Sequence, residues 1–449
     1  MSGSVELVNN RTQFFRPASS ACGVQPGVTL AVDDSLNPPP MSTLIQPAPW
    51  RRDAPTIGAV SLAHGLSHFG QLLVPPLFPW IGPAMGLSHT QLGVLLTVFY
   101  AVSCGAQAMA GFVVDRIGAR PVLYAGLGLL ALAMAGLAAS ATYPAMLACM
   151  VLAGLGNSVF HPVDFSILNH RVSASRLGHA YAAHGISGNV GWALAPLFVV
   201  GVTQATGSWR AALAAAAGVI ALALAALLLA RTHLEGASVS HRAATGASTA
   251  AGSFDFLRLP AVWVCFSFFL IFAFALGGIQ SFAPAAAAQL HGMGAEQTAL
   301  CVSAYMAAAA VGMVLGGHLV RDPQRSVRIA ASGFGVSAAL ALMVGFGHWS
   351  TVMVPVLFGA MGLSSGTAGP SRDLLVKQAT PEGATGRVYG VVYSGLDVGM
   401  AGGALLLGAL MDAQHVRAVW AAIAFALLLL VVSAFNVRRR WRRPVPVPA

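Results

Sequence analysis

The chain has 449 residues, of which 56% are hydrophobic and only 8% are charged, whereas a typical soluble domain carries about 25% charged residues. This composition cannot cover a water-facing surface, so it excludes a soluble globular domain and predicts a protein that crosses a lipid bilayer several times. The net charge of +10 would favour a nucleic-acid partner only if it formed one basic surface, and its distribution along the chain argues against that role.

The chain opens with a segment unlike the rest. Residues 1–54 are polar, contain several prolines and hold no apolar run long enough for the core of a signal peptide. We predict a disordered cytoplasmic tail here. Met41 follows three prolines and is a candidate start, so we expect residues 1–40 to contribute nothing to the fold.

Twelve apolar runs follow, each long enough to cross the bilayer as a helix. The predicted runs are 56–81, 92–114, 121–141, 144–168, 179–202, 210–230, 261–286, 299–320, 326–346, 351–371, 387–410 and 418–437. A polar linker, 232–260, divides them into six and six. The predicted parts are therefore an N-terminal bundle at 55–231, a C-terminal bundle at 261–437 and a basic cytoplasmic tail at 438–449.

The basic residues predict the orientation. If both ends of the chain lie inside, 22 of the 24 lysines and arginines fall on the inner side, and only Arg210 and Arg417 fall outside. The positive charge is thus a topology signal. It predicts a multi-pass protein of the cell inner membrane with cytoplasmic termini, and it leaves no basic surface for nucleic acid.

The two halves repeat weakly at an offset of 208 residues. The offset aligns Gly154, Pro162 and Gly191 with Gly362, Pro370 and Gly399. Because six helices separate the copies, both have the same orientation in the membrane. We therefore predict an all-α fold of two pseudo-symmetric six-helix bundles, the arrangement of a large class of secondary transporters.

A charged, glycine-bearing loop joins the second and third runs, with the sequence GFVVDRIGARPVL. Its marked positions are Gly111, Asp115, Arg116, Gly118 and Arg120. The pattern resembles the signature loop of the major facilitator superfamily. The resemblance implies the fold of that family, and it implies that the charged residues of this loop latch the two bundles together on the inner side.

A narrower resemblance rests on three segments: GAVSLAHGLSHFGQLL in the first run, GLGNSVFHPVDF in the fourth and AYAAHGISGNVGWALAP in the fifth. Together they are similar to the fosmidomycin-resistance branch of the superfamily, whose members are exporters. The chain departs from proton-driven drug exporters at two points. No arginine stands near Met150, and the antiporter motif of the fifth helix is reduced to Gly191 and Ala195-Pro196.

Polar residues inside the apolar runs are the candidate functional residues. Of the 14 acidic residues, only Asp164 and Asp397 fall clearly within the runs, where a charge costs about 2.5–3.5 kcal/mol on insertion scales. Asn157, His161 and Asp164 are spaced by four and three, so they share one face of a continuous helix.

The first run carries a similar face. It consists of His64, His68 and Gln71. The family resemblance implies that the first and fourth helices line a central cavity, where the two faces would meet. Proline interrupts helical hydrogen bonding, so we predict hinges at Pro162 and at its repeat partner Pro370.

Further candidates for the cavity are His184, Asn189, Gln280, Arg372 and Asp397. Arg372 would pair with an anionic substrate or simply follow the positive-inside rule. The imidazoles at His64 and His68 suit a metal ion by spacing, but no third ligand is evident in the sequence, so no metal site is predicted. No cofactor is predicted either, and the absence of a phosphate-binding G-x-x-x-x-G-K-[ST] loop leaves an ion gradient as the energy source.

The sequence therefore predicts a monomeric secondary active transporter. It would exchange protons for a small, drug-like or anionic molecule and export that molecule by alternating access. One alternative is a proton symporter that imports an organic anion. An alternative of another class is an intramembrane enzyme using His161 and Asp164 as acid and base.

Overall fold

The computed structural model describes residues 50–234, 260–319, 325–379 and 385–441, without the side chains at 108, 261, 372–379, 385–391, 393 and 436–441. The expectations for residues 1–40 and Met41, and most of the predicted linker 232–260, lie outside these residues. All described helices belong to one unit of the chain, Pro47–Ala449.

The first six predicted runs fold into the helices of the N-terminal bundle. These are α1 Trp50–Gln71, η2 Pro75–Leu77, α2 Phe78–Met85, α3 His89–Ile117, α4 Ala119–Ala139, α5 Tyr143–Asn157, α6 Phe160–Arg171, η3 Ala174–Arg176, α7 Leu177–Thr206, α8 Trp209–Leu229 and η4 Arg231–His233. The η elements are single 3₁₀ turns at helix junctions.

The second six runs fold into the C-terminal bundle. Its helices are α10 Pro260–Ser281, α11 Ala283–His291, α12 Ala295–Leu319, α13 Ser326–Phe346, α14 Met353–Ala379, α15 Thr385–Asp412 and α16 Val416–Trp441. Within the described residues the fold is entirely helical, as the sequence predicts.

Eleven candidate membrane spans meet the criteria of length and apolar composition among the described residues. The tenth predicted run, 351–371, is also helical and forms most of α14, but it is not among the eleven. Its stretch GLSSGTAGPS is rich in glycine and serine, which lowers its mean hydropathy. Such small residues suit a helix that packs closely against its neighbours rather than against lipid.

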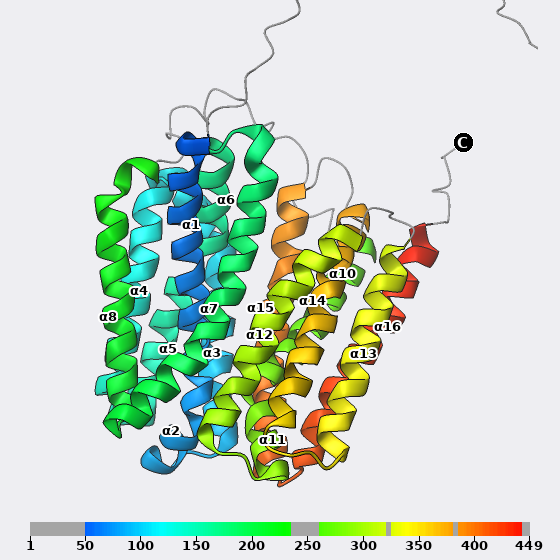
Figure 1. Cartoon of the computed structure of the whole chain (residues 1–449). Coiled ribbons are helices and arrows are strands. Elements are labelled where there is room, and N and C mark those ends of the chain that lie inside the picture. The colour runs from blue at the N-terminus through cyan, green and yellow to red at the C-terminus, as the bar shows by residue number, and fades with distance from the viewer. Residues whose placement is uncertain (1–49, 235–259, 320–324, 380–384, 442–449) are drawn as a thin grey trace, which may run out of the picture. The chain divides into compact units, whose positions relative to one another are not determined.

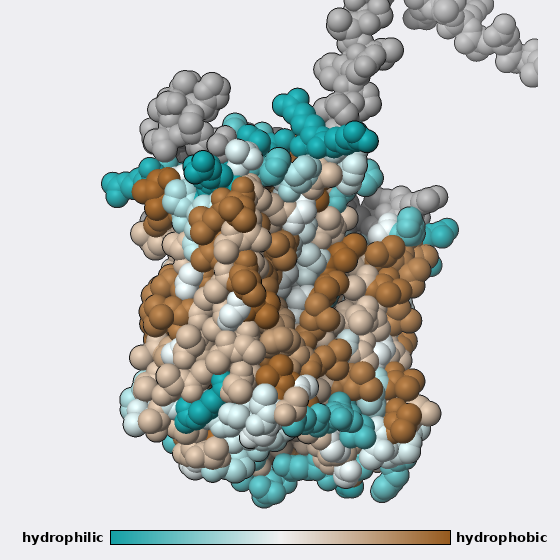
Figure 2. Space-filling view, turned by 60° about the vertical axis from the view of Figure 1, so that its left-hand side comes forward, coloured by the Kyte–Doolittle hydropathy of each residue, from teal (hydrophilic) through white to brown (hydrophobic). Residues whose placement is uncertain are grey.

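Figure 1 shows the two halves as neighbouring bundles of long, roughly parallel helices. In Figure 2 hydrophobic residues cover the middle of the visible face, and hydrophilic residues gather at its two ends. Large apolar side chains such as Leu222, Leu229 and Phe425 are exposed. This distribution is that of helices whose middle sections face lipid.

The sequence repeat corresponds to equivalent contacts in the two bundles. In the first bundle a Cβ on Gly191 of α7 would collide with the carbonyl oxygen of Gly65 on α1. In the second, a Cβ on Gly399 of α15 would collide with the carbonyl oxygen of Leu270 on α10. Each bundle thus uses glycine to bring its first and fifth predicted helices into backbone contact.

The fourth predicted run is not one continuous helix. α5 ends at Asn157 and α6 begins at Phe160, so the helix is interrupted at Ser158 and Val159. Pro162 lies in the first turn of α6, where its missing N–H removes no bond within that helix. Its repeat partner Pro370 lies inside α14, which continues through it. The interruption therefore coincides with the first predicted hinge and not with the second.

The two bundles meet closely where α3 packs along α15. Asp412, at the end of α15, accepts hydrogen bonds from the backbone N–H groups of His89 and Thr90 at 2.8 Å each, and from the Thr90 hydroxyl at 2.5 Å. Gly93 and Gly408 lie where an added Cβ would approach a carbonyl oxygen of the other helix to 2.5 and 2.7 Å. At this end of the molecule the bundles are joined by a carboxylate that caps the first turn of a helix in the other bundle.

Candidate functional site

The candidate site lies where α1, α6 and α7 of the N-terminal bundle come together. α7 has glycine at two positions that face α1. A Cβ on Gly188 would lie 2.7 Å from His68 Nδ1 and 2.9 Å from His64 Nε2, and one on Gly191 would strike the backbone at Gly65. The sequence HGISGNVG thus leaves room for both α1 histidines against the backbone of α7.

Asp164 is the centre of the site. Its side chain, on α6, is fully buried, and its Oδ2 lies 3.0 Å from His184 Nε2 and 3.2 Å from His64 Nδ1. The contact with His184 is a hydrogen bond, while His64 Nδ1 is close but makes no well-directed bond. Asp164 Oδ1 has no hydrogen-bond partner within the described residues. A carboxylate from one helix is therefore held by imidazoles from two others.

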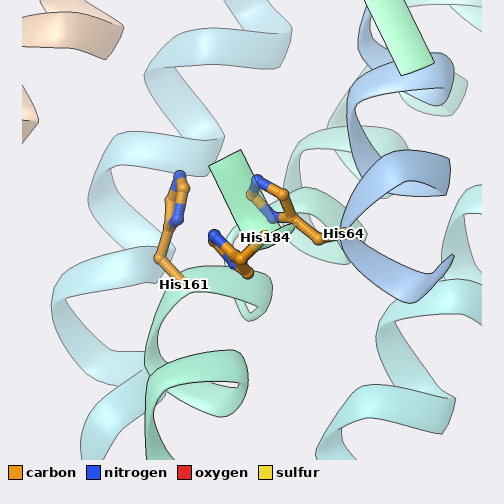
Figure 3. A group of neighbouring side chains, drawn as sticks. All are labelled: His64, His161 and His184. Carbon is orange, nitrogen blue, oxygen red and sulfur yellow. The ribbon is translucent and has the colours of Figure 1, made fainter. Parts of the chain in front are cut away.

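Four imidazole rings form a group that contacts this carboxylate through His64 and His184. The rings of His64 and His184 stack with centroids 3.5 Å apart, and His64 lies 4.4 Å from His68 and 5.4 Å from His161. Figure 3 shows the rings of His64, His161 and His184 pointing toward one another. We call His64, His68, His161, His184 and Asp164 the histidine cluster. Imidazole titrates in the physiological range, so such a cluster can bind and release protons.

A second buried network lies beside the histidine cluster. Gln71 Nε2 donates to Asn157 Oδ1 at 2.8 Å, and Asn157 Nδ2 donates to Ser103 Oγ at 2.9 Å. Trp192 Nε1 donates to Gln71 Oε1 at 3.1 Å. The Trp192 ring lies 4.0 Å from the ring of His68, which joins this network to the histidine cluster.

The structure therefore brings most of the predicted α1 and α6 residues together, but it divides them into two groups. Asn157, His161 and Asp164 were expected on one helix face. Asn157 contacts Gln71 and Asp164 contacts His64, both on α1, so Asn157 joins the glutamine network and Asp164 lies among the histidines. His184 directly contacts the carboxylate.

Two residues of the site were not predicted from the sequence. Ser103 is a fully buried hydroxyl on α3, and Trp192 follows His184 by eight residues, about two helical turns. The spacing His184, Gly188, Trp192 on one side of α7 is the signal that could have found the tryptophan. Ser103 gives no comparable signal, because small hydroxyl residues are common in membrane helices.

The other predicted cavity residues lie elsewhere. Asn189 Nδ2 donates to the carbonyl oxygen of Gly185 and lies 3.3 Å from the sulfur of Met313 on α12. Gln280 is buried on α10, with its Oε1 unpartnered within the described residues. Asn189 therefore reaches the C-terminal bundle, and Gln280 lies within that bundle on α10. The hydrogen bonds described for these two residues do not involve the histidine cluster.

Asp397 lies on α15 and interacts electrostatically with Tyr100 and Cys104 of α3. It thus stands at the boundary between the bundles, and its place in a cavity with the histidines stays a prediction. The side chain of Arg372 lies outside the described residues, so its predicted role stays a prediction.

The predicted latch loop joins α3 to α4. Gly118 has φ of +90°, a conformation that favours glycine, and it allows α4 to begin directly after α3 ends. Arg120 Nη1 donates to the carbonyl oxygen of Arg231 at 3.4 Å, a contact within the N-terminal bundle. The latch across the bundles by Gly111, Asp115, Arg116 and Arg120 stays a prediction.

Comparison with known proteins defines the class of this protein. Residues 60–371 match the Major Facilitator Superfamily, so the chain belongs to that family. It is a multi-pass membrane protein and a secondary transporter of small molecules, and the family sets aside the intramembrane-enzyme alternative.

Two bacterial sequences are similar to this chain over most of their length. The fosmidomycin resistance protein of Escherichia coli (strain K12) is 28% identical over 389 residues, covering 84% of this chain and 92% of that protein. The uncharacterized MFS-type transporter YfnC of Bacillus subtilis (strain 168) is 27% identical over 388 residues, with the same coverage.

Among solved structures, a bacterial homolog of the human lysosomal transporter Spinster, in an inward-facing and occupied conformation, has the same fold. Its TM-score is 0.70 at 15% sequence identity, and the match covers 88% of this chain and 99% of that one. The fold of two six-helix bundles predicted from the sequence is thereby confirmed.

Proposed function

We propose that this protein exports a small, drug-like or anionic molecule in exchange for protons, by alternating access of its two bundles. The likeness to a fosmidomycin resistance protein supports export. The 22-to-2 division of basic residues supports a position in the cell inner membrane with both termini in the cytoplasm. With both termini in the cytoplasm, the contact of Asp412 with the first turn of α3 would lie at the outer end of the molecule.

The observation that carries the proton-coupling proposal is Asp164. It is a fully buried carboxylate in hydrogen-bond contact with His184, and His64 lies 3.2 Å away. His68 and His161 complete its titratable surroundings from α1 and α6. Carboxylate and imidazole are the groups that exchange a proton near neutral pH when their solvation changes. A proton taken up here would be released when the cluster opens to the more alkaline cytoplasm.

The proposed substrate contacts are the polar groups next to this cluster. Gln71 and Asn157 offer amides, Trp192 offers an aromatic face, and His161 is only half-buried. This arrangement would link a bound molecule to the protonation of Asp164 through short contacts. Asn189, Gln280 and Arg372 are secondary candidates for binding a molecule that reaches between the bundles.

The test is flux in proteoliposomes with an imposed pH gradient, over a panel of phosphonates, drugs and carboxylates. For any substrate found, Asp164→Asn should abolish concentration against a gradient and preserve downhill exchange, because the variant keeps the shape of the side chain but cannot release a proton. Asp397→Asn is the matched control, since it neutralises the other carboxylate within the predicted spans.

The comparison of the two variants decides the role of the site. If Asp164→Asn still concentrates substrate with the pH dependence of the wild type, Asp164 is not the coupling group. If only Asp397→Asn loses uphill flux, coupling belongs to the α3–α15 boundary. Elution of each variant as a single species from size-exclusion chromatography establishes that both fold.

A further inference from the structure

The histidine cluster has the donor atoms of a metal site. His64, His161 and His184 each offer one ring nitrogen, and these three atoms all lie within 4.8 Å of one another. They come from α1, α6 and α7, so three separate helices aim imidazoles at one point, as Figure 3 shows. The sequence alone predicted no metal site, because it showed no third ligand beside His64 and His68.

A second observation concerns atoms without partners. Among the described residues, the buried atoms Asp164 Oδ1, His64 Nδ1 and His68 Nδ1 accept or donate no well-directed hydrogen bond. Buried polar groups in folded proteins nearly always have a partner. His64 Nδ1 still lies 3.2 Å from Asp164 Oδ2, so Asp164 Oδ1 is the buried acceptor that a bound ligand would satisfy.

The chemistry of these atoms selects the ligand. We propose that His64, His161 and His184, with Asp164, bind one divalent transition-metal ion of the Zn²⁺ class. Imidazole nitrogen suits zinc, cobalt, nickel and copper, whereas magnesium and calcium prefer sites built from oxygen. The carboxylate supplies the fourth ligand through Oδ1, and its negative charge offsets part of the charge of the ion.

Binding requires a small contraction of the cluster. Zinc–nitrogen bonds of about 2.0–2.1 Å in a tetrahedron place the nitrogens about 3.4 Å apart. The rings of His64 and His184, now stacked with centroids 3.5 Å apart, must tilt so that a nitrogen of each points at the ion, and His161 must turn inward. His161 is half-buried, so its ring is the proposed ligand that would turn to admit the ion.

This inference goes beyond the proposed transport function and does not depend on it. Metal binding is measured at equilibrium, without a gradient or a transported molecule. If the protein binds metal but fails the flux test, the metal site stands and the coupling proposal is wrong. If it shows coupled flux but binds no metal, the coupling proposal stands and the metal site is wrong.

The experiment uses Co²⁺ as a probe with the full-length protein, purified through an affinity tag that contains no histidine. Tetrahedral Co²⁺ gives strong visible absorption bands, whereas octahedral Co²⁺ gives weak ones. We expect one Co²⁺ per chain with strong bands, displaced by stoichiometric Zn²⁺. His161→Gln should lower the affinity at least about tenfold, the loss typical of damage to a metal site.

The matched control is His179→Gln, which removes an exposed imidazole from the same helix as His184. It should leave the bands and the affinity unchanged. His64→Gln provides a second cluster variant, and the near-ultraviolet circular dichroism of every variant should match the wild type. The proposal is overturned if the wild type binds no Co²⁺ at one per chain, if the bands are weak, or if both cluster variants bind as the wild type does.

Discussion

Asn157 is a residue whose two hydrogen bonds hold three helices in register. It accepts a bond from Gln71 of α1 and donates one to Ser103 of α3, while it ends α5 itself. Asn157 is buried, with only 8% of its surface exposed. An unpartnered amide in such a place costs about 1–3 kcal/mol.

Replacing Asn157 tests this network. We expect Asn157→Leu to lower the free energy of unfolding by about 1–3 kcal/mol, because the Gln71 amide loses its acceptor. The double variant Gln71→Leu/Asn157→Leu should cost less than the sum of the two single changes, since both partners are then removed. Unfolding by titration of a denaturing detergent into micelles measures all four proteins. Strict additivity would show that the two amides do not interact.

At the scale of helices, the contact of α1 with α7 is the element that builds the histidine cluster. The two helices approach at Gly65, Gly188 and Gly191, and no larger residue fits at the last two positions without moving the neighbouring helix or its histidines. Helix packing through small residues is the main source of close association inside a bilayer. The site and the packing therefore depend on the same glycines.

Gly188→Ala should displace the imidazoles of His64 and His68, because its Cβ would lie 2.7–2.9 Å from their rings. We expect a lower thermal midpoint and loss of uphill flux. Gly201→Ala on the same helix is the matched control, since no atom lies within 4 Å of an added Cβ there. It should retain the thermal midpoint and the flux of the wild type. Equal behaviour of the two variants would contradict the role given to Gly188.

These helices also show how much of the structure can be predicted from the sequence. Hydropathy predicted the helices well, because each must be apolar over a bilayer's width. Helical spacing placed Asn157 and Asp164 on one face, and both contact α1, Asn157 at Gln71 and Asp164 at His64, although the helix is interrupted between them at Ser158 and Val159. The contact of Asp164 with His184 could not be predicted, since it depends on how closely two helices pack and not on spacing along either one.

At the scale of the whole molecule, Asp412 joins the two bundles at one end. Its carboxylate caps the first turn of α3 and lies 2.9 Å from the His89 ring. A negative charge at a helix N-terminus is stabilising by about 0.3–1 kcal/mol, and the hydrogen bonds add to this. The contact stabilises the conformation in which this end is closed.

Asp412→Asn should therefore shift the population toward molecules open at this end. Spin labels at Ala141→Cys and Ser350→Cys, in a background without other cysteines, would report longer distances by pulsed electron resonance. Glu296→Gln, an exposed acid in the first turn of α12, is the matched control and should leave the distances unchanged. An unchanged distribution in Asp412→Asn would show that the carboxylate does not set the closed state.

The orientation of the whole molecule has its own test. From the basic residues we expect residue 248 of the predicted linker in the cytoplasm and Ser350 outside. In intact cells a thiol reagent that cannot cross the membrane should label Ser350→Cys and not Ser248→Cys. Lysed cells should give labelling at both positions, which controls for reactivity. Strong labelling of Ser248→Cys in intact cells would reverse the topology.

The ion-pairing partners identified for Asp164 both belong to one bundle: His64 comes from α1 and His184 from α7, while the carboxylate itself is on α6. When two rigid bundles tilt against each other, contacts inside either one persist. The histidine cluster would then travel as a unit, keeping its bonds while the water around it changes. Its two states would differ in hydration and not in hydrogen-bond partners. Movement of the C-terminal bundle would then expose the proton to water on one side of the membrane at a time.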